Sequence, residues 1–172
     1  MESKNQLVNR VATSSLVTFD LEQYYQSGER ISIDIKDQLF QELILKEKDF
    51  RDYIKSRDWS QYKNKFVAIH CSADAIVPTW AYMLLSTAVE PYASRVIFGT
   101  QEELETQLFY DVFSKVDWTL YKDAKVVIKG CSKVNVPVAV YVEATNRLRP
   151  LVSSLMFGEA CSTVPLYKRA KS

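Results

Sequence analysis

The chain has 172 residues, of which 47% are hydrophobic and 25% charged, as in a typical globular domain. Its 22 basic and 21 acidic residues leave a net charge of +1, which excludes the strong positive field of a nucleic-acid-binding protein. The first 15 residues lack the apolar core of a secretory signal, and no run of about 18 apolar residues predicts a membrane span. We therefore expect one compact domain over residues 1–172, in the cytoplasm, with neither nucleic acid nor membrane as a partner.

The first predicted elements are a strand and a long helix. The segment RISIDI (30–35) has the β-branched residues of a strand. From Asp37 to about Lys55, apolar residues recur every three or four positions, which predicts an amphipathic helix. The run FVAIH (66–70) is short, apolar and β-branched, as expected for a strand covered on both faces. A second helix is predicted after Pro78, since proline suits a helix start.

The second half of the chain repeats this pattern. FRDYIKSRDWSQYK (50–63) matches FYDVFSKVDWTLYK (109–122) at six of fourteen positions without a gap, including the tryptophan. FVAIH then corresponds to KVVIK (125–129), and VPTWAY (77–82) to VPVAVY (136–141), once Gly130 is treated as an insertion. An internal repeat of this kind indicates duplicated structural units. The alternative for the shared Asp-Trp and Tyr-Lys pairs is a role in packing and turns, without chemistry.

Further elements complete the second copy. A strand is predicted at SRVIFG (94–99), followed by a helix to about Val116 whose capping box consists of Thr100 and Glu103. Alternating strands and helices favour an α/β fold with a largely parallel sheet and flanking helices. We predict two β-α-β-α units, at about 30–90 and 94–150, related by a pseudo-twofold within a single domain.

The three cysteines share one sequence context. Cys71 opens CSADAIVP, Cys131 opens CSKVNVP and Cys161 opens CSTVP. The odd number argues against a disulfide framework and is consistent with a reducing compartment. Cys71 and Cys131 follow the two equivalent strands directly or after one residue, at the sheet edge where ligands gather in open α/β folds.

Three interpretations of the cysteines stay open. Convergent thiolates would form a metal site for zinc or for iron as an iron–sulfur cluster, with Asp74, Glu159 or His70 as further ligand. Alternatively, the cysteines are small buried hydrophobic residues of the core. The third interpretation is a thiol used in redox or sulfur-transfer chemistry, with Cys71 as the nucleophile.

Other catalytic signals are missing from the sequence. His70 is the only histidine, and a lone histidine in an apolar strand is typical of a core or edge residue. Neither the GxSxG motif nor a phosphate-binding glycine loop occurs. Glu143 and Arg147 have the spacing of an exposed helical ion pair, and the functional alternative places them in a cleft beside the cysteines.

The cysteine phrases, IVPTWAYMLL (76–85) and the ending FGEACSTVPLYK (157–168) make the sequence similar to a bacterial family known as domain of unknown function 2480. The resemblance runs from LVNRVATSSLVTFDL (7–21) to the terminal LYKR and supplies no activity. It implies a neighbourhood of genes for iron–sulfur cluster assembly. U-type assembly scaffolds also use three cysteines and an aspartate. Their aspartate lies two residues after a cysteine, in the sequence CGD, whereas Asp74 lies three residues after Cys71.

These observations give a leading hypothesis and two alternatives. The leading one is an accessory protein with a metal or thiol site at Cys71, Cys131, Cys161 and Asp74, linked to iron–sulfur metabolism and its protein partners. The main alternative is a protein–protein interaction module, a homo-oligomer included, with buried structural cysteines. The remaining one is a thiol-dependent enzyme.

Overall fold

The structure is a computed structural model that describes residues 16–130, 133–159 and 162–170. It divides into two compact units. Unit 1 consists of Met1–Gln26 and Thr106–Ser172, and unit 2 is the intervening Ser27–Glu105. Each unit contains its own β-sheet and its own hydrophobic core.

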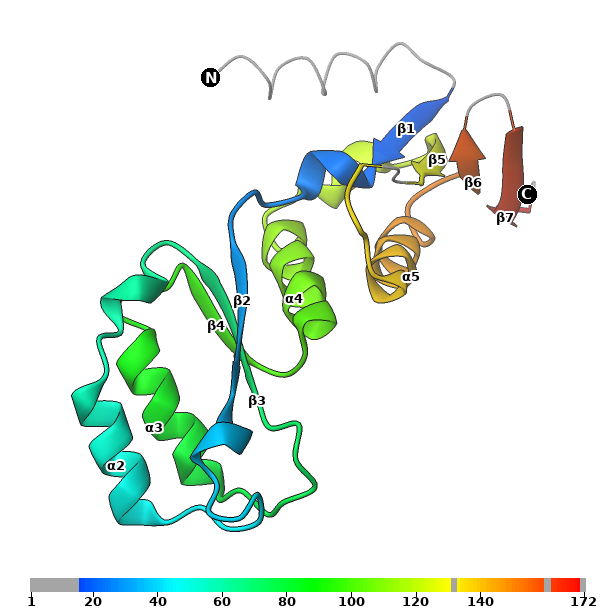
Figure 1. The fold of residues 1–172 in the computed structure, drawn as a ribbon. Helices are drawn as coiled ribbons and strands as arrows, with labels where there is room; N and C mark the ends of the chain where they lie inside the picture. Colours follow the sequence, from blue (N-terminus) through cyan, green and yellow to red (C-terminus); the bar gives the residue numbers. More distant parts are fainter. Residues whose placement is uncertain (1–15, 131–132, 160–161, 171–172) are drawn as a thin grey trace. The chain divides into compact units, whose positions relative to one another are not determined.

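Unit 2 is built on a parallel three-stranded sheet of order β2-β3-β4. The strands are β2 (Arg30–Asp34), β3 (Phe66–His70) and β4 (Arg95–Phe98). Figure 1 shows α2 (Glu47–Ser56) and α3 (Thr79–Val89) side by side, and both contribute to one core with the sheet. Two short 3-10 helices, η2 (Ile35–Gln38) and η3 (Ser60–Tyr62), complete the unit. The central strand is the most deeply buried because it has a neighbour on each side.

Unit 1 has a four-stranded sheet of order β1-β5-β6-β7, in which only the last strand is antiparallel. The strands are β1 (Val17–Asp20), β5 (Lys125–Lys129), β6 (Ser154–Glu159) and β7 (Ser162–Lys168). The α-helices in its described part are α4 (Gln101–Phe113), whose first residues belong to unit 2, and α5 (Val138–Leu148). The 3-10 helices are η1 (Leu21–Tyr24) and η4 (Trp118–Tyr121).

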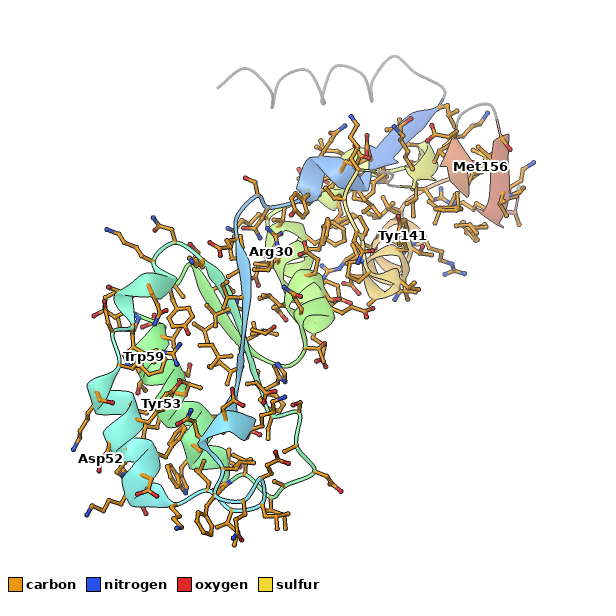
Figure 2. The ribbon with its side chains drawn as sticks, in the orientation of Figure 1. Arg30, Asp52, Tyr53, Trp59, Tyr141 and Met156 are labelled. Carbon is orange, nitrogen blue, oxygen red and sulfur yellow. The ribbon has the colours of Figure 1, made fainter. Side chains whose placement is uncertain are left out.

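The core of unit 1 is centred on Phe19. This side chain is 1% exposed and stacks on Tyr24 and Trp118 with ring centroids 4.8 and 5.4 Å apart. In unit 2, Trp59 packs edge-on against Tyr53, on the side of the unit where α2 lies (Figure 2). Both tryptophans donate their indole N–H to a backbone carbonyl five residues earlier, so each closes the end of the preceding helix.

The predicted α/β class with mostly parallel strands is confirmed, but the assignment of strands to units was partly wrong. The predicted strand at 94–99 exists as β4, yet it pairs with β3 and completes the first sheet. The first strand beside β5 is instead β1, a segment for which no strand was predicted. β6 and β7 were not predicted as strands. The pseudo-twofold and the single-domain organisation stay predictions.

The helix predicted from Asp37 was wrong in its first half. The α-helix begins only at Glu47, and the preceding segment folds back on itself, with an antiparallel bridge between Phe40 and Ile44. Gln41 and Glu42 between them have φ values of 52° and 59°, outside the helical region. The apolar residues of this segment are largely exposed, so their helical spacing does not correspond to a buried face.

The predicted start of α4 is confirmed. Thr100 Oγ1 accepts a hydrogen bond from the Glu103 N–H at 3.2 Å, and Glu103 Oε2 accepts one from the Thr100 N–H at 2.6 Å. These two bonds form the reciprocal capping box. Gly99 immediately before it has φ +141°, a conformation that side chains rarely adopt, and a Cβ there would lie 2.6 Å from the Glu103 carboxylate. Among the helices described, none is long and apolar enough to cross a membrane.

Candidate functional site at the carboxyl edge of unit 2

The strands of unit 2 are parallel, so their carboxyl ends meet at one edge of the sheet. β2 ends at Asp34, β3 at His70 and β4 at Phe98, and Asp34 is the register partner of His70. Cys71 and Ser72 follow β3 directly. Because ligands of open parallel sheets bind at this edge, it is the candidate functional site.

The Asp34 carboxylate holds the loop that contains Cys71. Asp34 Oδ1 accepts hydrogen bonds from the backbone N–H groups of Lys36 and Ser72, both at 3.0 Å. Asp34 Oδ2 accepts a third from the Ser72 hydroxyl at 2.5 Å. Burial acts to raise the pKa of this carboxyl, but the hydrogen bonds from Ser72 and Lys36 outweigh it and hold the pKa below its usual value.

Cys71 has a free, half-buried thiol in this loop. Its Sγ donates to the carbonyl oxygen of Ala73 at 3.8 Å, a long contact that leaves the sulfur available for other partners. Tyr82 of α3 lies within electrostatic reach of the same group. Burial raises the pKa of the Tyr82 hydroxyl, and the neighbouring Cys71 and Asp34 raise it further. The edge therefore combines a thiol, a carboxylate, a phenol and the Ser72 hydroxyl.

An apolar groove of about 630 Å³ lies next to these polar groups. It runs between α3 and β4 and shares Tyr82 with the polar cluster. Phe98 lines one side of the groove, and its side chain is 69% exposed. Its ring packs edge-on against Tyr82, with ring centroids 4.9 Å apart. The lining residues carry no formal charge; they are Ile69, Thr79, Tyr82, Met83, Ser86, Thr87, Val96, Ile97 and Phe98.

The structure tests only part of the predicted metal site. Cys131 and Cys161 lie outside the described residues, so their convergence with Cys71 stays a prediction. Asp74 is exposed in the loop after Cys71, and His70 is partly buried at the end of β3. Within the described ranges, no three His, Cys, Asp or Glu side chains are grouped to hold a metal ion. Cys71, His70 and Asp74 therefore do not form a metal site by themselves.

The other predicted residues belong to unit 1. Arg147 Nε donates to Glu143 Oε1 at 2.7 Å, which is the helical ion pair that their spacing predicts. The Arg147 guanidinium also lies 6.0 Å from the centre of the Trp118 ring. Glu159 is exposed at the end of β6, as register partner of Ser162. Glu143 and Arg147 thus form an ion pair on α5, and their place in a cleft beside the cysteines stays a prediction.

The repeated CS…VP phrase has a structural explanation around Cys71. Ser72 binds Asp34, Val77 packs against the core of unit 2, and Pro78 directly precedes α3. In the second phrase, Val136 and Pro137 occupy the equivalent places before α5. The third phrase differs, because its described residues lie on strand β7, which begins at Ser162.

Sequence reasoning missed Asp34, Ser72 and Tyr82 as members of the site, and it missed the groove. One signal was present: Asp34 ends a strand pattern and is followed by one apolar residue and then by a charged one, as Asp20 is in TFDLEQ (18–23). The partner of that aspartate is 38 residues away in the sequence, and such a pairing has no local pattern.

The comparisons with known proteins agree with the resemblance of the cysteine phrases. No curated protein and no solved structure matches the sequence. The model of one family, described as "Protein of unknown function (DUF2480)", matches residues 5–169. Because this match covers almost the entire chain, the protein belongs to the DUF2480 family, for which no function is established.

Proposed function

We propose that the protein is an accessory protein whose functional group is the Cys71 thiol, presented at the carboxyl edge of unit 2. The observation that carries this proposal is the position of Cys71: a free, half-buried thiol follows the central strand and lies near Tyr82, which lines an apolar groove. A thiol needs partial exposure to react, and Cys71 has it.

The hydrogen bonds of Asp34 support this role because they fix the residue next to the thiol. Ser72 is held through both its backbone N–H and its hydroxyl, so the start of the loop is ordered before any ligand binds. A site that is preorganised in this way avoids part of the entropy cost of binding. The apolar groove then provides the surface that a bound partner would cover.

The metal form of this proposal needs donors besides the described ones. Cys131 and Cys161 would supply thiolates, which are the usual ligands of zinc and of iron–sulfur clusters. The link to iron–sulfur metabolism belongs to the same proposal, and thiolate chemistry is its support. In the metal form the three cysteines act together, whereas in the thiol form Cys71 acts alone.

Two measurements on the full chain separate these forms. Anaerobically purified protein is analysed for zinc and iron and by UV–visible absorption, with the variant in which all three cysteines are replaced by Ser as control. Stoichiometric metal that disappears in the control supports the metal form. Metal-free protein in which Cys71 reacts with a maleimide before unfolding, measured in the Cys131→Ser/Cys161→Ser variant, supports the thiol form. Metal-free protein whose thiols react only after unfolding overturns both.

A second candidate function is a protein–protein interaction module with structural cysteines. The groove favours it, since exposed apolar surface beside an edge strand is a common binding surface for extended segments. In this case, replacing Cys71 by Ser leaves partner binding unchanged.

We also propose that the two units arose by internal duplication. Matching backbone contacts support it: Asn64 N–H donates to Tyr92 O at 3.0 Å, and 59 positions later Asp123 N–H donates to Leu151 O at 2.9 Å. Asn64 and Asp123 also share positive φ values of 61° and 60°. In this scheme the second copy is unit 2, inserted between β1 and α4 of the first. Independent folding of residues 27–105, measured by circular dichroism and NMR, tests it, and a permanently unfolded fragment would speak against it.

A further inference from the structure

The outer edge of β4 has hydrogen-bonding groups available for another strand. Among the described residues, β3 is its only strand neighbour. The Gly99 N–H points toward β3, because it donates to Ile69 O at 2.9 Å. Peptide groups alternate in direction along a strand, so those of Ile97 also face β3, while those of Val96 and Phe98 point outward. An exposed edge of this kind is a template for pairing with another chain.

The helix beside this edge is also unusual for a surface element. α3 has no charged side chain from Thr79 to Val89, although Thr79, Met83 and Thr87 are exposed along one stripe. Met83 is 65% exposed and lines the groove. Helices without a charged face are normally covered by protein. The edge of β4 and the exposed stripe of α3 therefore form one continuous apolar surface, which we call the β4 surface.

Unit 1 shows how the equivalent surface is covered. Its third parallel strand, β6, pairs on its outer edge with the antiparallel strand β7. Tyr141 of α5 packs edge-on against Phe157 of β6, as Tyr82 packs against Phe98, and Figure 2 shows Tyr141 and Met156 on these two elements. With β7 present, Phe157 is 39% exposed, against 69% for Phe98. An antiparallel strand is thus the natural cover for the β4 edge.

We propose that the β4 surface is covered by the same surface of a second copy of this chain, with the two β4 strands antiparallel across a twofold axis at Ile97. This register places Val96 opposite Phe98 of the second copy, so the outward peptide groups of both strands form hydrogen bonds. It places Arg95 opposite Gly99, so no like charges face each other across the strands. The inference does not rest on the proposed thiol function.

Self-pairing is favoured over a charged partner because the residues that line the groove carry no formal charge. Arg95, the one charged residue of β4, lies opposite Gly99 in this register. A twofold axis brings the same surface of both copies together, so a surface with many charges of one sign would repel its own copy. The axis is perpendicular to the sheet, so α3 of both copies lies on the same side and Met83 fills the groove of the second copy. This helix contact is necessary, because pairing of a four-residue strand alone buries less surface than the about 800 Å² that each partner of a stable complex buries.

Sedimentation equilibrium of the full chain over a range of concentrations tests the association. We expect a dimer that Met83→Glu weakens at least tenfold in Kd, because two carboxylates would meet in an apolar contact. The matched control is Val142→Glu, at the equivalent exposed position of α5, which should leave Kd unchanged. Circular dichroism confirms that both variants fold. The proposal is overturned if the wild-type protein stays monomeric at the highest concentration of the series. It is also overturned if both variants weaken the dimer equally.

The register is tested separately by a disulfide. In a variant with the three native cysteines replaced by Ser, Ile97→Cys should form a crosslinked dimer under mild oxidation, because directly opposed residues at a non-hydrogen-bonded pair are about 4.5 Å apart at Cα. Lys122→Cys, on the surface of unit 1, is the control and should not crosslink above background. Equal crosslinking of the two variants would contradict the predicted axis. Since the native cysteines are absent, failure here leaves the thiol proposal untouched, and the reverse also holds.

Discussion

In the part of the chain that the structure describes, the two units have the same order of elements from β1 and from β2 onward but differ in what borders their third strand. In both, a strand and a 3-10 helix precede an α-helix, a second 3-10 helix, the central strand, another α-helix and a third parallel strand. In unit 1, β7 continues the sheet beyond β6, and Tyr167 of β7 packs against the core. In unit 2, β4 has no such strand in the part of the chain described. One scaffold thus supports a covered sheet and an open one.

The helices next to the third strands differ in the same sense. α5 carries the Glu143–Arg147 ion pair, whereas α3 has no charge in its entire length. A charged helix is soluble at the surface, while an uncharged one gains free energy when it is covered. The uncharged helix α3 thus lies in the unit whose third strand has no further strand neighbour among the described residues.

The largest expected effect distinguishes the two cores. Phe19→Ala removes the ring that stacks on Tyr24 and Trp118, and we expect a loss of about 3–5 kcal/mol in the free energy of unfolding. Ile33→Ala, at the matched position of β2, should cost about 2–4 kcal/mol because a smaller side chain is removed. Urea denaturation followed by fluorescence measures both. A larger loss for Ile33→Ala would show that the aromatic cluster is not the main support of unit 1.

The next prediction compares the third parallel strands of the two units, β6 and β4. Leu155 of β6 is fully buried, whereas Val96 at the matched position of β4 is only partly buried. Leu155→Ala should therefore cost about 2–4 kcal/mol, and Val96→Ala about 1 kcal/mol in the monomer. Urea denaturation at low protein concentration gives both values. Equal losses would mean that β7 does not account for the difference in burial.

Asp34 gives a smaller and pH-dependent effect. Asp34→Ala removes three hydrogen bonds and should cost about 1–2 kcal/mol at neutral pH, while Ser72→Ala, which removes only the hydroxyl, should cost about 0.5–1 kcal/mol. The pKa of Asp34 is lower in the folded than in the unfolded protein, so its carboxylate stabilises the fold above about pH 4. This contribution is lost as the pH falls through the folded pKa. The difference between wild type and Asp34→Ala should shrink in that range, and a constant difference would refute the linkage.

The smallest effect is expected on α5. Glu143→Gln removes an exposed ion pair and should cost less than about 0.5 kcal/mol, with no change in thiol reactivity or metal content. Thermal unfolding in low and high salt measures it, since salt screens the charge interaction. A marked loss of bound metal or of thiol reactivity in this variant would show that Glu143 contributes to the functional site.

The sequence alone determined the elements whose signals are local. The β-branched runs of β3 and β5 and the capping box of α4 require only residues close in the chain, and all three are present as predicted. The helical spacing around Phe40 shows the limit of such signals, because two residues with positive φ interrupt it and the side chains are not buried.

Only the tertiary structure decided which strands are neighbours and which side chains form the site. β1 pairs with β5, which lies more than a hundred residues later in the sequence. β4 was predicted to begin the second unit, but it pairs with β3 of the first sheet. Asp34 meets Ser72 for the same reason, since both lie at the ends of adjacent parallel strands. Strand pairing joins segments that are distant in sequence, so composition and periodicity do not specify it. The open edge of β4 exists only because of that pairing.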